Sequence, residues 1–143
     1  MSSNLTEIIT PIQVMFFDTD TGGVVHNTAY LRFIETARTQ LAFQLGMDWK
    51  FMRETSIFPV IVRTEIDYRR PAIMGDHLEV HAWLGEKTKA RFWCHFKICR
   101  PSDNTLLITS QQLLAFVEMP KGRPLRLPEG FPTPFTPKKT ERN

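Results

Sequence analysis

The sequence predicts an α+β fold in which a sheet of long strands packs around one long helix. Two observations lead to this prediction. Over residues 30–45, apolar side chains recur at three- and four-residue spacing, which is the period of an amphipathic helix. Four later segments are instead rich in β-branched and aromatic residues or alternate between apolar and polar side chains, as strands do. One helix followed by successive long strands favours an antiparallel sheet that wraps around the helix.

The first strand is expected at 12–17, where an apolar run follows Pro11 and stops at an acidic turn. Residues 19–26 have the composition of a loop. Within this loop, Gly22 and Gly23 allow the backbone to adopt positive φ or to approach a ligand closely.

The long helix is expected to begin at Asn27 or Thr28, since both residue types are favourable N-caps. Gly46 is a suitable residue directly after its last turn. No second long helix is expected. The apolar stripe of the helix consists of Tyr30, Phe33, Ile34, Ala37, Leu41 and Leu45.

The later strands complete a five-stranded antiparallel sheet. Pro71 ends the first of them, and the turn-forming run 101–104 separates the last two. These strands are expected at 60–68, 77–86, 90–100 and 106–118.

The 143 residues suit one domain with a single buried core, expected at 1–119. The remaining residues, 120–143, contain six of the ten prolines and form a basic tail. Because proline is unsuited to helices and central strands, we expect this tail to lie along the surface of the same domain or to be partly disordered.

The formal net charge of +3 does not indicate a nucleic-acid partner. From residue 120 onward, six Lys and Arg oppose two Glu, which gives +4 for the tail and −1 for the rest of the chain. The body is therefore nearly neutral and offers no basic face. No apolar run reaches the roughly 20 residues of a membrane span, so no span is expected.

The two cysteines favour a reducing cytoplasm. Cys94 and Cys99 are an odd number of residues apart on one expected strand, so they face opposite sides at a distance too large for a disulfide. Free thiols are typical of cytoplasmic proteins. The first ten residues lack the basic and apolar regions of a signal peptide, and none is expected.

The residues with the clearest chemical potential are Asp18 and Asp20, which precede the helix in the acidic turn. A carboxylate there can act as a nucleophile or as a general base. The unpaired N–H groups of a helix N-terminus carry about half a positive charge and can stabilise a developing oxyanion. Either aspartate can instead simply bond the backbone N–H groups of the turn.

The order of these residues resembles that of the acyl-CoA thioesterases of the hotdog fold. The strongest match is D-T-D-x-G-G-V-V at 18–25, followed by Y-L-x-F-x-E-x-A-R-T at 30–39; weaker matches occur at 65–72 and 122–124. The most similar branch is that of the 4-hydroxybenzoyl-CoA thioesterases, which includes the Tol-Pal-associated thioesterases. The resemblance implies a hotdog fold, in which a five-stranded antiparallel sheet wraps around one long central helix.

By this resemblance, Asp20 is the catalytic carboxylate, either as nucleophile or as general base, and Asp18 shapes the turn. The backbone N–H of Asn27 would polarise the thioester carbonyl at the helix start. Relatives usually read V-V-Y-H-A-N-Y, whereas this chain reads V-V-H-N-T-A-Y at 24–30, so Asn27 occupies the position of the family histidine. His26, one position earlier, is either its substitute or a loop residue without a catalytic role.

A coenzyme A thioester also needs cations near its phosphates. The resemblance places basic residues at the turn between two strands, where this chain has Lys87, Lys89 and Arg91. Arg69 and Arg70 form a second candidate pair, and either cluster can instead be a solvated turn. No separate cofactor is implied, because coenzyme A is part of the substrate.

No metal centre is predicted. His77 and His81 share one face of an expected strand, but roughly 13 Å separates them, too far to bind one ion. The sequence also lacks a G-x-S-x-G elbow and a P-loop.

Glu35 lies about 12 Å along the helix from its start, too deep to act on a thioester there. An ion pair with Arg32 or Arg38 is its expected role.

These features favour a cytoplasmic thioesterase that hydrolyses acyl-CoA or aroyl-CoA thioesters. Two alternatives stay open: an acyl-carrier-protein thioesterase or related thioester lyase, and a non-catalytic module that binds acyl thioesters. Trp83 and Trp93 lie on the polar face of the expected sheet. Exposed tryptophans mark contact surfaces, so we expect at least a homodimer, or a homotetramer packed through this face. The resemblance implies that the sites of the dimer lie at the subunit boundary.

Overall fold

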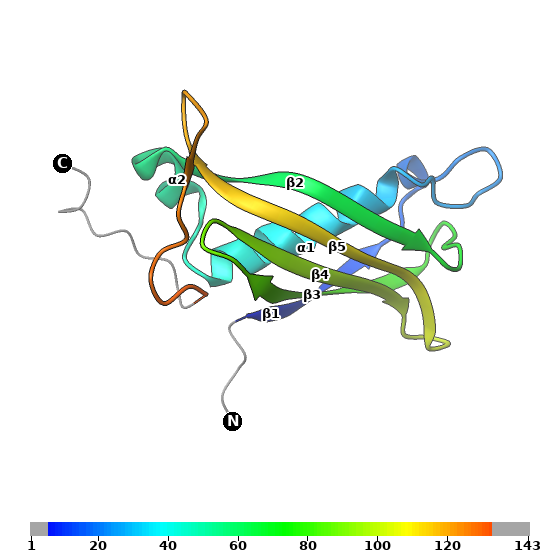
Figure 1. Cartoon of the computed structure of the whole chain (residues 1–143). Coiled ribbons are helices and arrows are strands. Elements are labelled where there is room, and N and C mark those ends of the chain that lie inside the picture. The colour runs from blue at the N-terminus through cyan, green and yellow to red at the C-terminus, as the bar shows by residue number, and fades with distance from the viewer. Residues whose placement is uncertain (1–5, 133–143) are drawn as a thin grey trace.

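The computed structural model describes residues 6–132. In chain order the elements are β1 Glu7–Gln13, the 3₁₀ turn η1 Phe16–Asp18, α1 Ala29–Gln44, α2 Trp49–Thr55, β2 Ile57–Tyr68, β3 His77–Lys87, β4 Arg91–Arg100, β5 Thr105–Glu118 and β6 Arg123–Leu125. The strands form one antiparallel sheet of order β1-β3-β4-β5-β2, and β6 pairs with the end of β5. Helix α1 runs along one face of this sheet (Figure 1). The predicted α+β fold with five long strands around one helix is confirmed, and β6 adds a sixth, short strand.

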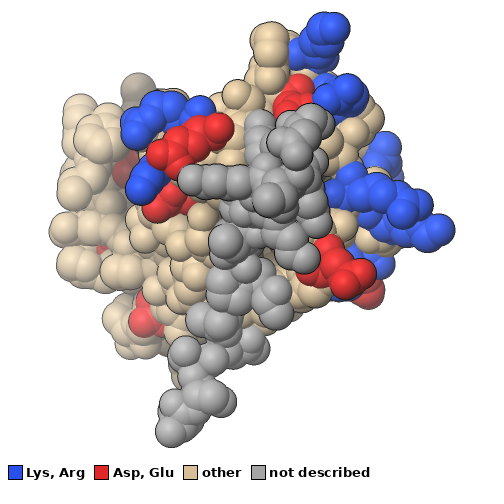
Figure 2. Space-filling view, turned by 90° about the vertical axis from the view of Figure 1, so that its left-hand side faces the viewer, with Lys and Arg blue, Asp and Glu red and all other residues tan. Residues whose placement is uncertain are grey.

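The two ends of the molecule carry different elements. The loop between η1 and α1 lies at one end, whereas α2, the last turn of α1 and the turn between β3 and β4 lie at the other (Figure 1). At this second end, Lys and Arg side chains lie next to Asp and Glu (Figure 2). None of the helices among residues 6–132 is long and apolar enough to cross a membrane.

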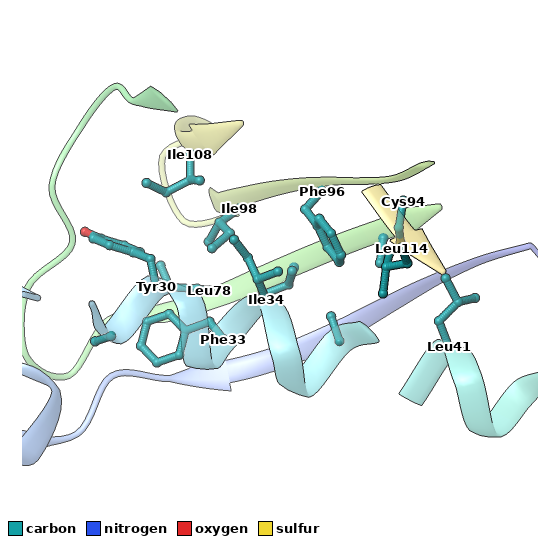
Figure 3. Close-up of a cluster of buried hydrophobic side chains, with 14 of the residues drawn as sticks. Tyr30, Phe33, Ile34, Leu41, Leu78, Cys94, Phe96, Ile98, Ile108 and Leu114 are labelled. Carbon is teal, nitrogen blue, oxygen red and sulfur yellow. The ribbon is translucent and has the colours of Figure 1, made fainter. Parts of the chain in front are cut away.

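The core lies between α1 and the inner face of the sheet, where side chains from both meet (Figure 3). On α1 the buried positions keep the predicted helical spacing, whereas along β3 and β4 burial alternates with a period of two. Cys94 belongs to this core and Cys99 is half-buried, and both thiols are free, as predicted. The largest fully buried side chains of the core include Ile34, Leu41, Leu78, Phe96, Ile98 and Leu114.

The first strand lies earlier in the chain than predicted. The sequence indicates 12–17, but Phe16–Asp18 forms a 3₁₀ turn. The early end of the strand has a local cause, because Asp18 Oδ2 accepts a hydrogen bond from Met15 N–H at 2.8 Å and closes the turn. The early start reflects pairing with β3, whose register begins at Glu7. Pro11 lies inside β1, where its missing N–H is tolerated because β1 is an edge strand of the main order.

The boundaries of the long helix agree with prediction. Thr28, one of the two expected caps, precedes α1, although its side chain makes no capping hydrogen bond. Gly46 follows the helix with φ +92°, a conformation that glycine adopts without a Cβ clash. The sequence analysis misses α2, a helix of seven residues whose N-cap Asp48 accepts a hydrogen bond from Phe51 N–H at 2.9 Å.

Residues 120–132 do more than follow the surface of the domain. Strand β6 pairs with β5 despite its proline, and Phe131 is 4% exposed within an aromatic cluster with Phe92 and Phe116. The expected surface position is wrong for Phe131, because burial of its ring fixes this part of the segment against the core. The rest of the predicted tail, 133–143, lies outside the described residues.

Candidate active site

The segment that joins η1 to α1 folds back on itself as a tight turn. Asp20 N–H donates to Val24 C=O at 2.9 Å, and Gly23 N–H donates to Asp20 C=O at 3.0 Å. Gly23 has φ +78°, which explains the need for glycine at this corner. Two further backbone hydrogen bonds tie the returning arm to the segment 72–74. The turn is therefore fixed in position, with Asp20 on it.

The two aspartates of this turn have different environments, and Asp18 is the buried one. It is 2% exposed. Its Oδ2 accepts from Met15 N–H, and its Oδ1 accepts from the guanidinium of Arg32 on α1, 2.8 Å away. Because both oxygens are occupied, Asp18 serves as a link between the turn and the helix.

Asp20, in contrast, is exposed to solvent. Its Oδ1 accepts a hydrogen bond from Gly22 N–H at 2.9 Å, which fixes the orientation of the carboxylate. Its Oδ2 makes no hydrogen bond or ion pair within residues 6–132. That oxygen is free to accept a proton or to attack an electrophilic carbon.

The start of α1 offers a free backbone amide in the same loop. The N–H groups of Ala29 and Leu31 donate to the carbonyls of His26 and Thr28. The N–H of Asn27 donates no hydrogen bond among the described residues, and Asn27 is exposed. An amide at a helix N-terminus favours a negatively charged acceptor, so this one is available to an oxygen of a bound molecule.

His26 is held through its backbone. Its N–H donates to Asp18 C=O at 3.0 Å, and its C=O accepts from Ala29 N–H. The side chain is half-buried, and its ring makes no hydrogen bond within the described part of the chain. His26, Asn27 and Asp20 therefore lie in one loop, and their side chains make no hydrogen bond to one another within residues 6–132.

The cations predicted for coenzyme A lie at the other end of the fold. Lys87, Lys89 and Arg91 flank the turn between β3 and β4, at the end of the molecule where α1 ends (Figure 1). The ammonium of Lys87 donates to Phe131 C=O, while Lys89 and Arg91 are exposed. Because the 16 residues of α1 span about 24 Å, these cations do not meet Asp20 within one chain.

The second candidate pair, Arg69 and Arg70, lies beside the start of α1. Both arginines are exposed and follow Tyr68, the last residue of β2. The hydroxyl of Tyr68 donates to Asn27 C=O at 3.1 Å. The sequence analysis does not single out Tyr68, although it belongs to the weaker family match at 65–72.

Comparison with known proteins identifies the family. The sequence model described as Thioesterase-like superfamily matches residues 14–135. The chain belongs to this superfamily. Acyl-CoA thioesterase YbgC of Haemophilus influenzae is 31% identical over 127 residues, which cover 87% of this chain and 91% of that protein. Acyl-CoA thioester hydrolase YbgC of Escherichia coli O6:H1 is 27% identical over 132 residues, which cover 92% and 98%.

Comparison with solved structures also finds thioesterases similar to this chain. A probable thioesterase from Bartonella henselae superposes with a TM-score of 0.79 at 26% identity, over 85% of this chain and 99% of that one. The predicted hotdog fold and the predicted class of enzyme, a thioesterase, are both confirmed by these relatives.

The middle of α1 differs from expectation in this thioesterase. Glu35 is exposed and makes no ion pair within residues 6–132. Its expected partners bond elsewhere: Arg32 reaches Asp18, and Arg38 donates to Gln112 Oε1 at 2.6 Å. The expected ion pair of Glu35 is therefore wrong, because each arginine reaches an acceptor that is more buried.

Neither cysteine is suited to serve as the nucleophile of the thioesterase. Burial raises the pKa of the Cys94 thiol to about 12, against a smaller opposite effect of Arg38. Burial also raises the pKa of Cys99, and the carboxylate of Glu79 adds to this effect. Because the thiolate is the reactive form, both residues are protonated and weakly reactive near neutral pH.

Proposed function

We propose that this thioesterase hydrolyses an acyl-CoA or aroyl-CoA thioester to the free acid and coenzyme A, with Asp20 as its catalytic carboxylate. One observation carries the proposal: the exposed carboxylate of Asp20, oriented by Gly22 N–H, shares a fixed loop with the free amide of Asn27. The relatives are named as acyl-CoA hydrolases, and we extend this substrate class to the present chain. The resemblance of the loop motif at 18–25 supports our proposal that the chain belongs to the branch of 4-hydroxybenzoyl-CoA and Tol-Pal-associated thioesterases.

Two chemical routes fit this loop. In the first, an oxygen of Asp20 attacks the thioester carbon, Asn27 N–H holds the resulting oxyanion, and coenzyme A leaves as its thiolate. Water then cleaves the mixed anhydride, which releases the acid and restores the carboxylate. In the second, Asp20 takes a proton from water as that water attacks the same carbon, and the proton passes to the leaving thiolate. Water is the co-substrate in both routes, and neither route needs a cofactor.

His26 is the third catalytic candidate. Its ring has no hydrogen-bond partner among residues 6–132, and it directly precedes the amide of Asn27. We propose that the His26 ring contacts the substrate in place of the family histidine. In relatives that histidine lies one residue later, at the position of Asn27. The same shift favours a second candidate function, a module that binds acyl thioesters without cleaving them.

We propose a homodimer whose sites lie at the subunit boundary. The cations at Lys87, Lys89 and Arg91 are too far from Asp20 in one chain, so a partner chain would supply them to the coenzyme. β2 is an edge strand of the main sheet order, and its apolar residues 60–62 are exposed. An apolar edge strand is a favourable surface for pairing with another chain. A homotetramer would add contacts through the outer face of the sheet.

We also propose that the protein is located in the cytoplasm, because its two cysteines are free thiols.

Release of free thiol from a panel of acyl-CoA and aroyl-CoA thioesters tests the proposal. We expect hydrolysis of at least one member, and we expect Asp20→Asn to lose it. Acyl-carrier-protein thioesters, assayed in parallel, decide between the two carriers. A parent protein that binds acyl-CoA but releases no thiol above the Asp20→Asn background would support the binding module instead.

A further inference from the structure

The outer face of the sheet carries a cluster of metal-ligating side chains outside the loop site. Glu79 and His81 are two residues apart on β3, on the opposite face from the buried Leu78 and Val80. In the antiparallel register of β3 with β4, Cys99 lies directly opposite Glu79. Two neighbouring strands thus bring together an oxygen, a nitrogen and a sulfur ligand, and α1 covers the other face of the sheet.

The ligand atoms already lie close to the separations found in a metal centre. One atom of each of these three side chains lies within 4.8 Å of the other two, and Glu79 Oε1 is 3.4 Å from His81 Nε2. With bonds of about 2.0–2.3 Å, two ligands of a tetrahedral ion are roughly 3.3–3.7 Å apart. The carboxylate and the imidazole therefore match this spacing, and the Cys99 thiol has to approach by no more than about 1.5 Å.

The three side chains are partly shielded from solvent, yet an ion can reach them from the surface. All three side chains are half-buried. An open groove of about 550 Å³ at the β1 edge of the sheet includes His81, Trp83 and Lys97 among its lining residues, so the His81 side of the cluster is open to water. Lys97 pairs with His81 in the register of β3 and β4 and is exposed. Its charge opposes a bound cation, which makes it a useful probe.

We propose that Glu79, His81 and Cys99 bind one divalent cation of the Zn²⁺ class. Thiolate and imidazole ligands select Zn²⁺ over Mg²⁺ and Ca²⁺, which prefer oxygen ligands. As the metal–sulfur bond forms, the thiol proton passes to solvent. Three protein ligands leave the fourth position of a tetrahedral ion to water. The ion would join β3 to β4 and stabilise the sheet without entering the chemistry of the Asp20 loop.

Titration of the reduced, chelator-stripped full-length protein with Co²⁺ and then Zn²⁺ tests this site. We expect one Co²⁺ per chain, a thiolate-to-cobalt charge-transfer absorption band, and displacement of that band by Zn²⁺. Cys99→Ser should abolish the band, while His81→Gln and Glu79→Gln should each weaken Zn²⁺ binding at least about 10-fold. Lys97→Ala should strengthen binding, because it removes a like charge.

His95→Gln is the matched control, since His95 lies on the same face but outside the cluster. It should bind Zn²⁺ as the parent does. The site would be overturned by a parent without the charge-transfer band, by a band that persists in Cys99→Ser, or by equal weakening in His95→Gln. The readout is metal binding alone, so failure of the thioesterase proposal would not affect it.

Discussion

The carboxylate of Asp18 and the guanidinium of Arg32 lie 2.8 Å apart and join the acidic turn to α1. The side chain of Asp18 is 3% exposed and that of Arg32 is 55% exposed, so the acid is inside and the base reaches it from the surface. The other oxygen of Asp18 closes η1 through Met15 N–H. A single buried carboxylate thus positions the loop on which Asp20 is exposed.

Asp18→Asn is expected to lower the free energy of unfolding by about 1–3 kcal/mol, because it removes a charge that two hydrogen bonds satisfy. Arg32→Gln should cost at least as much, since it leaves the buried carboxylate without its partner. Urea denaturation of the three proteins measures both effects.

Arg63→Gln is the control for this experiment. Arg63 pairs with Glu65 at 2.6 Å, and both side chains are exposed. Ion pairs of that kind are typically worth less than about 1 kcal/mol. If Asp18→Asn is as stable as Arg63→Gln, the Asp18–Arg32 pair contributes no more to the free energy of unfolding than an exposed ion pair does.

Asp20→Asn is expected to keep the fold and to lose turnover. Asp20 is exposed and its Oδ1 accepts a single hydrogen bond, which the amide oxygen of asparagine also accepts. Positioned proton transfer is typically worth roughly 10²–10⁴-fold, so kcat should fall by that factor while the melting temperature stays the same. Near-normal turnover of Asp20→Asn on the parent's best substrate would remove Asp20 from the mechanism.

The periodicity of the sequence predicts those elements whose structure depends on nearby residues. Helix α1 and strands β3, β4 and β5 follow from spacing alone, because each is long and has one buried face. The first strand is misplaced because a side chain of the turn, Asp18, bonds the backbone of Met15 and ends the strand early. Phe131 is missed because its burial depends on Phe92 and Phe116, which are distant in sequence.

The same distinction holds for the candidate site. The loop with Asp20 and Asn27 is recognisable from one continuous motif, so the sequence predicts its place beside the helix start. The contact between Tyr68 and Asn27 joins residues from two elements that are far apart in the chain. The pairing of Cys99 with Glu79 depends on the register of β3 and β4, which no single strand reveals.

The two cation pairs make different predictions for coenzyme binding. If Lys89 and Arg91 contact the phosphates, replacing both by alanine should raise KM for an acyl-CoA by roughly 10-fold or more, since a hydrogen bond to a charged group is worth about 1.5–3 kcal/mol. KM for the matching acyl-pantetheine thioester, which lacks the nucleotide, should not change. Leaving Lys87 intact preserves its bond to Phe131 C=O.

Arg69→Ala with Arg70→Ala is the matched comparison, because these arginines lie beside the helix start of the same chain. If this pair alone raises KM for the acyl-CoA, the nucleotide lies on Arg69 and Arg70, and the role predicted for the β3–β4 turn is wrong.

Truncation should distinguish the packed part of the C-terminal segment from the rest. The ring of Phe131 lies 5.0 Å from Phe92 and 5.8 Å from Phe116, between ring centroids. A chain that ends after Leu127 loses this contact, and removal of a buried aromatic ring costs about 3–5 kcal/mol. A chain that ends after Pro132 keeps it and should melt at the parental temperature. Equal melting temperatures of the two truncated proteins would contradict the anchoring role of Phe131.

Because of Cys94, the free energy of unfolding should fall as the pH rises above about 9. Burial raises its pKa from 9.0 to about 12, so the folded state keeps the thiol proton while the unfolded chain releases it near pH 9. Between these two values the unfolded state binds fewer protons, and the free energy of unfolding falls by up to about 1.4 kcal/mol per pH unit. Below pH 9 this contribution is fully present and does not vary.

The part of this slope that comes from Cys94 should be lost when the thiol is removed. Cys94→Ala should unfold more easily at pH 8, because it leaves a small cavity in the core, but its stability should fall less steeply from pH 9 to 11 than that of the parent. Cys99→Ser, which changes a half-buried thiol, controls for the second cysteine and should keep most of the parental slope. Tyr30, whose pKa burial also raises, is present in all three proteins, so its titration cancels in the comparison. Parallel stability curves for the parent and Cys94→Ala over this range would show that the thiol of Cys94 titrates as it does in the unfolded chain.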